Sequence, residues 1–290
     1  MLVSSDWLAA HLTDPDLVVA DMRWRESGRG RALYERGHLP RAVYLDWSID
    51  LVDPDSPVAF MLAGPDRFAR AMEDHGIGDR TTVVAYADRM GSGPFRLWWA
   101  SRVYGHDDVR VLDGGWDRWV REGRPVSADT VEPTAAQWTP RPTTGLIATA
   151  DAVAEAVEDR HAVVLDSRAP EQYRGEFVWF ETGQVPAGPD GIARTPRGAC
   201  RAGHVPGAVN VPFALLYRED LTMKSPEELR EVLAEAGVDR STKAITYCGC
   251  GISASALLFA LKLAGVEDAA LYDASWEEWG RDTRLPVAKP

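Results

Sequence analysis

Residues 244–248 read Ala-Ile-Thr-Tyr-Cys, and Gly249-Cys250-Gly251-Ile252-Ser253 follows directly. The first stretch is short and apolar, as expected of a buried strand. The next segment, SASALLFALKLAG over residues 253–265, is expected to form a helix that Gly265 closes. A strand, a glycine loop and a helix therefore meet at Cys248. Strands that alternate with helices in this way predict an α/β fold with a parallel sheet.

The landmarks around this stretch occur twice in the chain. They are an Asp-x-Arg after a β-branched run, a Gly-His-aliphatic-Pro motif, an Asp-Arg turn before a strand, and an Asp-x-x-Trp-x-x-Trp segment, found at Asp21, His38, Asp79 and Asp113 and again at Asp166, His204, Asp239 and Asp273. Asp88 of the first copy stands where the second has Cys248. Asp88 to Asp113 spans 25 residues, and so does Cys248 to Asp273. Equal spacing over this distance predicts two copies of one domain.

The chain has 290 residues, about twice the length of a typical domain. We expect a first domain over 1–128, a linker over 129–145 and a second domain over 146–290. The linker is predicted because DTVEPTAAQWTPRPTTG is rich in Pro and Thr and has no periodicity. The second copy holds about 21 extra residues before Cys200, because Asp21 to His38 spans 17 residues and Asp166 to His204 spans 38. Ser225-Pro226-Glu227-Glu228 is a capping-box signature for a helix that ends at Gly237.

Composition limits the class of protein. Hydrophobic residues make up 45% of the chain and charged residues 26%, which is typical of a globular protein. The net charge of −12 would repel phosphate backbones, so we expect no nucleic-acid partner. The sequence suggests neither a signal peptide nor an 18-residue apolar span, and we therefore expect a cytoplasmic protein with no membrane partner.

The three cysteines, Cys200, Cys248 and Cys250, are too few for a disulfide framework. A glycine loop between a strand and a helix directs backbone N–H groups toward one side chain. A phosphate-binding loop would be expected to contain Lys or Arg, and residues 248–253 contain neither. For a thiol, the same geometry stabilises the thiolate and lowers its pKa, which predicts a nucleophile at Cys248. The alternative is a buried cysteine at a strand end that has no chemical role.

Three motifs together identify a family. Tyr-Cys-Gly-Cys-Gly-Ile-Ser at 247–253, Gly-His-Val-Pro-Gly-Ala at 203–208 and the Asp-x-x-Trp-x-x-Trp segments resemble the tandem-domain rhodanese family of thiosulfate and 3-mercaptopyruvate sulfurtransferases. The resemblance covers residues from about Ser4 to Pro286. It implies two tandem rhodanese-like domains, each a mainly parallel sheet flanked by helices. It also implies that the first domain is catalytically silent, since Asp88 replaces the cysteine, and that Cys248 carries sulfur as a persulfide.

The resemblance assigns further site residues. The active loop would consist of Cys248, Gly249, Cys250, Gly251, Ile252 and Ser253. Arg174 and Arg197 would bind the anionic sulfur donor, and a cleft in an acidic protein needs local arginines for this purpose. Asp46 matches an acidic position of the family. The expected acceptor is cyanide, a small thiol or a protein thiol, and neither a cofactor nor a metal is expected.

The sequence departs from both subtypes of the family. Cys250 stands where mercaptopyruvate enzymes carry Ser or Thr, and Phe60 precedes Met61-Leu62 where those enzymes have a His. The loop also lacks the Arg and Lys that follow the cysteine in thiosulfate enzymes. The preferred donor is therefore left open between thiosulfate and 3-mercaptopyruvate.

Other functions are compatible with parts of the sequence. Zinc could be held by Cys200, His204, Cys248 and Cys250. His204, however, has a repeat partner, His38, with no cysteine nearby, which favours a structural hydrogen bond at a turn. A cysteine phosphatase would need Arg at the position of Ala254. A non-enzymatic sulfur carrier would use the same thiol without turnover. The regularly spaced tryptophans are expected to pack helices rather than to form a ligand cage.

Overall fold

The chain divides into two units in a computed structural model that describes residues 1–25, 28–180 and 183–289. Unit 1 contains Met1–Pro54, Leu62–Thr144 and Tyr217–Met223, and unit 2 contains Asp55–Met61, Gly145–Leu216 and Lys224–Pro290. Each unit thus includes a short segment from the other half of the sequence. Of the predicted linker, 129–145, residues 129–144 belong to unit 1 and Gly145 belongs to unit 2. Trp138 anchors this segment, because its buried ring packs against Phe68 and His106.

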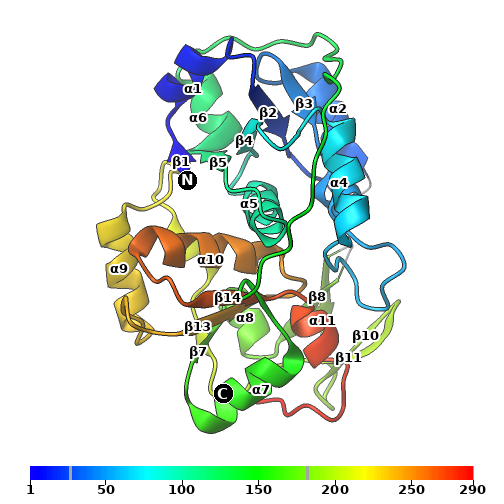
Figure 1. The fold of residues 1–290 in the computed structure, drawn as a ribbon. Helices are drawn as coiled ribbons and strands as arrows, with labels where there is room; N and C mark the ends of the chain where they lie inside the picture. The colour runs from blue at the N-terminus through cyan, green and yellow to red at the C-terminus, as the bar shows by residue number, and fades with distance from the viewer. Residues whose placement is uncertain (26–27, 181–182, 290) are drawn as a thin grey trace. The chain divides into compact units, whose positions relative to one another are not determined.

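Unit 1 is built on a parallel sheet with the strand order β1-β5-β4-β2-β3 (Figure 1). The strands are β1 (Leu2–Val3), β2 (Leu17–Asp21), β3 (Ala42–Tyr44), β4 (Thr82–Tyr86) and β5 (Val109–Leu112). The helices are α1 (Ser5–His11), α2 (Arg29–Arg36), α3 (Trp47–Asp50), α4 (Pro65–Asp74), α5 (Gly93–Val103) and α6 (Gly115–Arg121). Leu8 of α1, Tyr34 of α2 and Trp119 of α6 share one buried cluster with strand residues. Helix α5 also packs against this sheet, over β4 and β5 (Figure 1).

Unit 2 repeats this topology with a parallel sheet in the order β12-β7-β13-β14-β6. Its strands are β6 (Ile147–Ala148), β7 (Val163–Asp166), β12 (Val209–Asn210), β13 (Ala244–Tyr247) and β14 (Ala269–Tyr272). Its helices are α7 (Ala150–Asp159), α8 (Pro170–Tyr173), α9 (Pro226–Glu235), α10 (Ile252–Ala264) and α11 (Ser275–Trp279), with a 3-10 helix at Phe213–Leu216. The central strands also share one register: Asp21 is opposite Tyr86, and Asp166 is opposite Tyr247. The predicted fold of two copies, each a parallel sheet flanked by helices, is confirmed.

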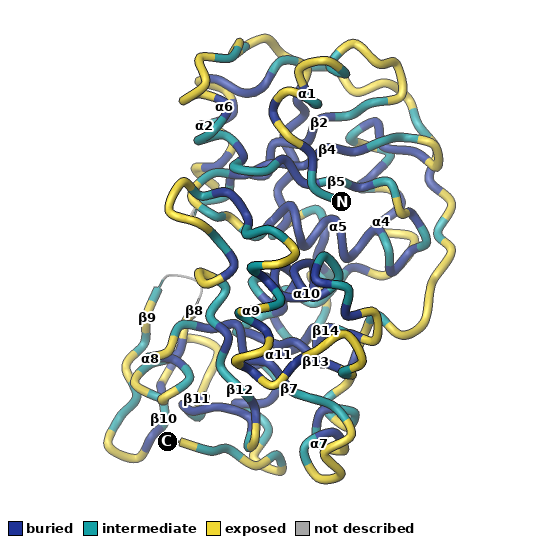
Figure 2. The backbone as a smooth tube through the Cα atoms, turned by 90° about the vertical axis from the view of Figure 1, so that its left-hand side faces the viewer, coloured by how far each residue is buried: buried dark blue, intermediate teal, exposed yellow. Residues whose placement is uncertain are grey.

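The two helices predicted beside the Cys248 stretch have the expected ends. Helix α9 begins with the capping box, in which Ser225 Oγ accepts the Glu228 N–H and the Glu228 carboxylate accepts the Ser225 N–H. Helix α10 ends at Gly265, whose φ of 91° is in the left-handed region that favours glycine. Figure 2 shows that α10 is buried along most of its length. Among the described residues, every helix is too short or too polar to cross a bilayer.

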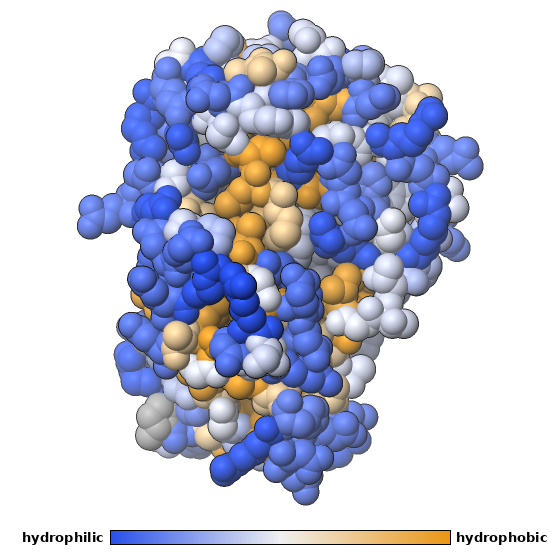
Figure 3. All heavy atoms as spheres, turned by 60° about the vertical axis from the view of Figure 1, so that its left-hand side comes forward, coloured by the Kyte–Doolittle hydropathy of each residue, from blue (hydrophilic) through white to orange (hydrophobic). Residues whose placement is uncertain are grey.

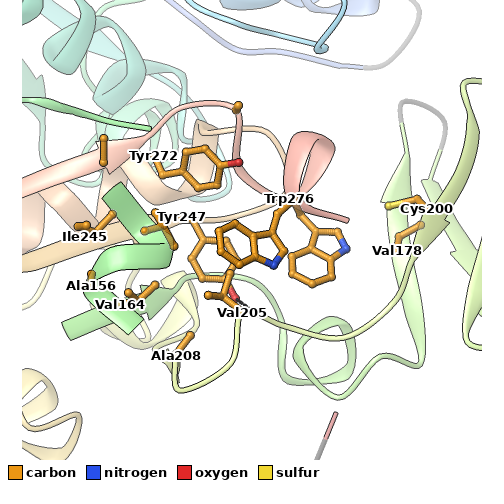
Figure 4. Close-up of a cluster of buried hydrophobic side chains, with 14 of the residues drawn as sticks. Ala156, Val164, Val178, Cys200, Val205, Ala208, Ile245, Tyr247, Tyr272 and Trp276 are labelled. Atoms are coloured by element: carbon orange, nitrogen blue, oxygen red, sulfur yellow. Dashed lines mark hydrogen bonds between the residues drawn. The ribbon is translucent and has the colours of Figure 1, made fainter. Parts of the chain in front are cut away.

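The extra residues of the second copy form two antiparallel hairpins. One pairs β8 (Phe177–Phe180) with β9 (Gly183–Pro186), and the other pairs β10 (Ile192–Thr195) with β11 (Gly198–Arg201). Val178 and Cys200 from these hairpins join the buried cluster that contains Tyr247 and Trp276 (Figure 4). The insertion is therefore anchored in the core of unit 2. The face drawn in Figure 3 is mostly hydrophilic, as expected of a globular protein with 26% charged residues.

Candidate active site

Cys248 follows the carboxyl end of β13 and is only 2% exposed. Both of its backbone groups are held by the segment that begins α11. Its N–H donates to Ser275 Oγ at 3.1 Å, and its carbonyl accepts the Trp276 N–H at 3.0 Å. The next carbonyl, that of Gly249, accepts the Glu277 N–H at 2.9 Å. The start of the loop is thus fixed to α11 by three hydrogen bonds, which restrict the position of the thiol.

Ser275 is the residue of this arrangement that sequence reasoning missed. It is fully buried, donates its hydroxyl to the Tyr272 carbonyl at 2.8 Å, and has a φ of 50°, which is uncommon outside glycine. Its counterpart in the first copy, Gly115, has a φ of 49°. The sequence did contain a signal for Ser275, since the second copy has serine where the first has Gly115. A serine persists in a left-handed conformation only when its contacts compensate the backbone strain.

The first copy holds its own loop differently. There the Trp116 N–H donates to the carbonyl of Ala87, one residue before Asp88. A Cβ added at Gly115 would lie 2.2 Å from that same carbonyl oxygen, so a serine does not fit the first copy as it stands. The hydroxyl contact to the residue after the strand is therefore a property of the second copy.

The rest of the Cys248 loop, residues 249–253, turns into α10 through Gly251, whose φ is 78°. The N–H groups of the first turn of a helix have no carbonyl partner within the helix, and here they adjoin the thiol-bearing loop. Ser253 Oγ lies 3.0 Å from Ser167 Oγ, which ties the end of the loop to the segment after β7. Cys250 is partly exposed, whereas Cys248 is buried. The predicted loop residues thus form one continuous turn at the amino end of a long helix.

A buried ion pair lies behind the loop and explains the Asp-x-Arg motif. Arg168 donates to both carboxylate oxygens of Asp166 and to the Gly203 carbonyl at 2.8 Å. Its guanidinium lies 4.4 Å from the ring of Trp276. Arg23 makes the equivalent contacts with Asp21 and the Gly37 carbonyl in the first copy. The motif therefore connects the sheet to the Gly-His segment and has a structural role in both copies.

The zinc hypothesis finds no matching geometry. Nowhere in residues 1–25, 28–180 and 183–289 do three His, Cys, Asp or Glu side chains gather so as to hold a metal ion. His204 lies 2.9 Å from the Tyr173 carbonyl through Nδ1 and stacks on the Tyr173 ring, as His38 does on Tyr34. Cys200 is packed in the core, and burial raises the pKa of its thiol to about 11. The histidine of the repeated motif thus has a structural hydrogen bond in both copies, as its presence in both copies suggested.

The remaining predicted residues lie in different surroundings. Arg174, which is 45% exposed, pairs with Glu176 at 2.8 Å and with Glu171 at 3.4 Å. Arg197 lies in the turn of the β10–β11 hairpin and donates to the Pro57 carbonyl at 3.0 Å. Arg197 and Pro57 both belong to unit 2, the unit that also contains Cys248. The segment 55–61, which carries Phe60, belongs to unit 2 as well.

Asp46 belongs to unit 1 and caps α3. One carboxylate oxygen accepts the Ser48 N–H and hydroxyl at 3.0 and 2.6 Å, and the other accepts the Tyr44 hydroxyl at 3.3 Å. Its side chain is thereby engaged within its own unit. Asp88 is likewise engaged, because Arg25 donates to its two carboxylate oxygens at 3.0 and 2.5 Å.

Comparison with known proteins agrees with this geometry. The rhodanese-like domain model matches residues 4–122 and 149–282. The chain belongs to the rhodanese family. It is 35% identical to a thiosulfate sulfurtransferase of Rattus norvegicus, covering 99% of this chain and 96% of the relative. It is 34% identical to the 3-mercaptopyruvate sulfurtransferase of Homo sapiens, covering 96% and 91%.

A third relative, named a sulfur carrier protein, comes from Thermus thermophilus and is 35% identical over 100% of this chain and 96% of its own length. Among solved structures, SseA from Escherichia coli, described with the 3-mercaptopyruvate sulfotransferases, matches with a TM-score of 0.80 and 29% identity over 95% of this chain and 98% of its own. This rhodanese is thus a two-domain sulfurtransferase, as the motifs predicted.

Proposed function

We propose that this rhodanese moves sulfur from a small anionic donor to a thiophilic acceptor through a persulfide on Cys248. The observation that carries the proposal is the fixed position of Cys248 between a strand end and the amino end of α10. We expect a negative charge at this point to be stabilised by the N–H groups of the first helical turn, which have no carbonyl partner within the helix, and by the helix dipole. Both the thiolate and the persulfide anion that replaces it benefit from this environment.

The reaction proceeds in two displacements. The Cys248 thiolate attacks the outer sulfur of thiosulfate, a new S–S bond forms, and sulfite leaves with the electron pair of the old one. With 3-mercaptopyruvate the thiolate attacks the thiol sulfur, the C–S bond breaks, and the resulting enolate takes up a proton to give pyruvate. The terminal persulfide sulfur is then attacked by the acceptor, which is cyanide, a small thiol or a protein thiol. The Cys248 thiolate leaves and is ready for another cycle.

Arg174 and Arg197 are proposed to bind the donor anion. Arg197 is supported by its position in a hairpin anchored in the core of unit 2. Arg174 is paired with exposed carboxylates, and a donor can replace such partners at small cost because exposed ion pairs are weak. Asp46 is the least supported of the proposed substrate residues, since its carboxylate already accepts hydrogen bonds from Ser48 and Tyr44.

The first copy is proposed to be catalytically silent. Asp88 cannot carry sulfur, and Arg25 neutralises its carboxylate.

The test is a comparison of the two donors with wild-type protein and with Arg174→Ala and Arg197→Ala. Loss of a charge-assisted contact should raise the KM for the donor roughly tenfold. Unchanged kinetics in both variants would refute the assignment of the arginines. The second candidate function, a sulfur carrier, is favoured by the name of the Thermus thermophilus relative. It predicts one sulfur atom transferred per protein molecule, whereas an enzyme gives many turnovers with a small acceptor.

A further inference from the structure

Arg281, two residues after α11, connects the insertion hairpin to the Cys248 loop. Its Nε and one terminal nitrogen donate to the two carboxylate oxygens of Glu277 at 2.9 and 3.2 Å. The Glu277 N–H in turn donates to the Gly249 carbonyl at 2.9 Å. Arg281 is therefore linked to the loop through Glu277: Arg281 binds the Glu277 carboxylate, and the Glu277 N–H binds the loop carbonyl.

The same guanidinium binds the turn of the β10–β11 hairpin. One terminal nitrogen lies 3.2 Å from the Arg197 carbonyl and 3.3 Å from the Gly198 carbonyl, and the other donates to Thr195 Oγ1 at 3.2 Å. Arg281 is 20% exposed and Glu277 is 11% exposed, so this pair is shielded from competing water. A planar fork of five donors suits this set of acceptors, and a lysine could not satisfy it.

From these contacts we infer that Arg281 is a positioning residue that holds Arg197 at a fixed place relative to Cys248. The inference rests on the proposed role of Arg197 in donor binding. Arg197 is then fixed at two points: its carbonyl by Arg281, and its guanidinium by the Pro57 carbonyl. The first copy has no counterpart, because the hairpin lies in the insertion that only the second copy contains.

A positioning role differs from a purely structural one in its consequences. Residues 196–199 are exposed, so water can replace the hydrogen bonds to their carbonyl groups when Arg281 is removed. The fold should survive, while the hairpin turn gains freedom. The predicted defect is therefore weaker donor binding, with the chemistry at Cys248 intact once the donor is bound.

The experiment measures donor KM and kcat for Arg281→Met, Arg197→Met and the double variant, with Arg284→Met as the control. Arg284 is 87% exposed and pairs with Asp282, so its removal makes the same change of charge without touching the hairpin or Glu277. We expect Arg281→Met to raise KM roughly three- to tenfold with kcat nearly unchanged, and Arg281→Lys to recover little of the loss. The double variant should be no worse than Arg197→Met, because both changes remove one contact.

Two results would overturn the inference. An Arg281→Met protein with wild-type KM, or a double variant whose defects multiply, would show that Arg281 does not act through Arg197. If Arg197→Met itself has normal kinetics, the inference fails together with that donor contact. Mass spectrometry of the same proteins distinguishes this outcome from failure of the sulfur-transfer mechanism, because the persulfide still forms on Cys248 in the first case and does not form in the second.

Discussion

Removing the hydroxyl of Ser275 should weaken both the fold and sulfur transfer. In Ser275→Ala the buried Cys248 N–H loses its acceptor, which costs about 1–3 kcal/mol, and the Tyr272 carbonyl loses a donor, which costs about 1 kcal/mol. The left-handed φ of 50° stays strained in alanine. Ser275→Gly loses the same hydrogen bonds but relieves about 1 kcal/mol of strain. We therefore expect Ala to be destabilised by about 2–4 kcal/mol and Gly by about 1 kcal/mol less.

Denaturant unfolding measures these free energies, and rapid-quench mass spectrometry measures the rate of persulfide formation. Both variants should form the persulfide roughly ten- to a hundredfold more slowly, because the nucleophile loses one of its anchors. Ser255→Ala is the matched control: Ser255 is fully buried and donates to the Ile252 carbonyl at 2.6 Å, and its hydroxyl makes no hydrogen bond with Cys248. Wild-type rates in both Ser275 variants would refute the role of the hydroxyl, and equal stability of Ala and Gly would refute the strain.

Three further predictions concern the cysteines and the exchanged segment. Burial raises the pKa of Cys200 from 9.0 to about 11, so the unfolded chain loses this proton first and stability falls as the pH rises from 9 to 11, by about 3 kcal/mol. Cys200→Ala should lack this part of the pH dependence in unfolding measurements, and an identical slope would contradict the cause given. We propose that the partly exposed Cys250 thiol protects Cys248 after oxidation by forming a disulfide with it, which reductant then reverses. Cys250→Ser should therefore retain turnover but lose the activity that reductant restores after mild peroxide, whereas collapse of turnover with every donor would make Cys250 catalytic. Residues 146–290 expressed alone lack segment 55–61, whose Val58 and Met61 pack on the core of unit 2. They should therefore be less stable in thermal unfolding and less active in turnover assays than the full chain. Full activity would show that the segment is dispensable.

The sequence predicted the elements whose signals are local or repeated. Equal spacing of the motifs in the two copies predicted that the copies share one topology. The central strands indeed pair in the same register in both, because Asp21 is opposite Tyr86 and Asp166 is opposite Tyr247. The capping box at Ser225 was predicted because its signal lies within four residues. The position of Cys248 at a strand end followed from the glycine loop and the helix after it.

Contacts between distant segments were not predictable in this way. The exchange of 55–61 and 217–223 between units leaves no periodic pattern. The bonds of Arg281 to the hairpin turn depend on packing between an insertion and the end of the chain, about 80 residues apart. The packing of segment 129–144 on unit 1 was not predictable either. The segment forms no helix or strand, and single contacts such as the hydrogen bond from the Trp138 N–H to Glu73 leave no pattern in the sequence.

The central claim is that Cys248 carries the sulfur, and the mass of the protein after incubation with donor tests it most directly. Wild-type protein treated with thiosulfate or 3-mercaptopyruvate should gain one sulfur atom, located on Cys248 by peptide mapping and released by cyanide. Cys248→Ser should gain none and should not turn over, while its unfolding transition stays close to that of the wild type. Substantial turnover by Cys248→Ser, or a persulfide found on Cys200 or Cys250 in its place, would contradict the account.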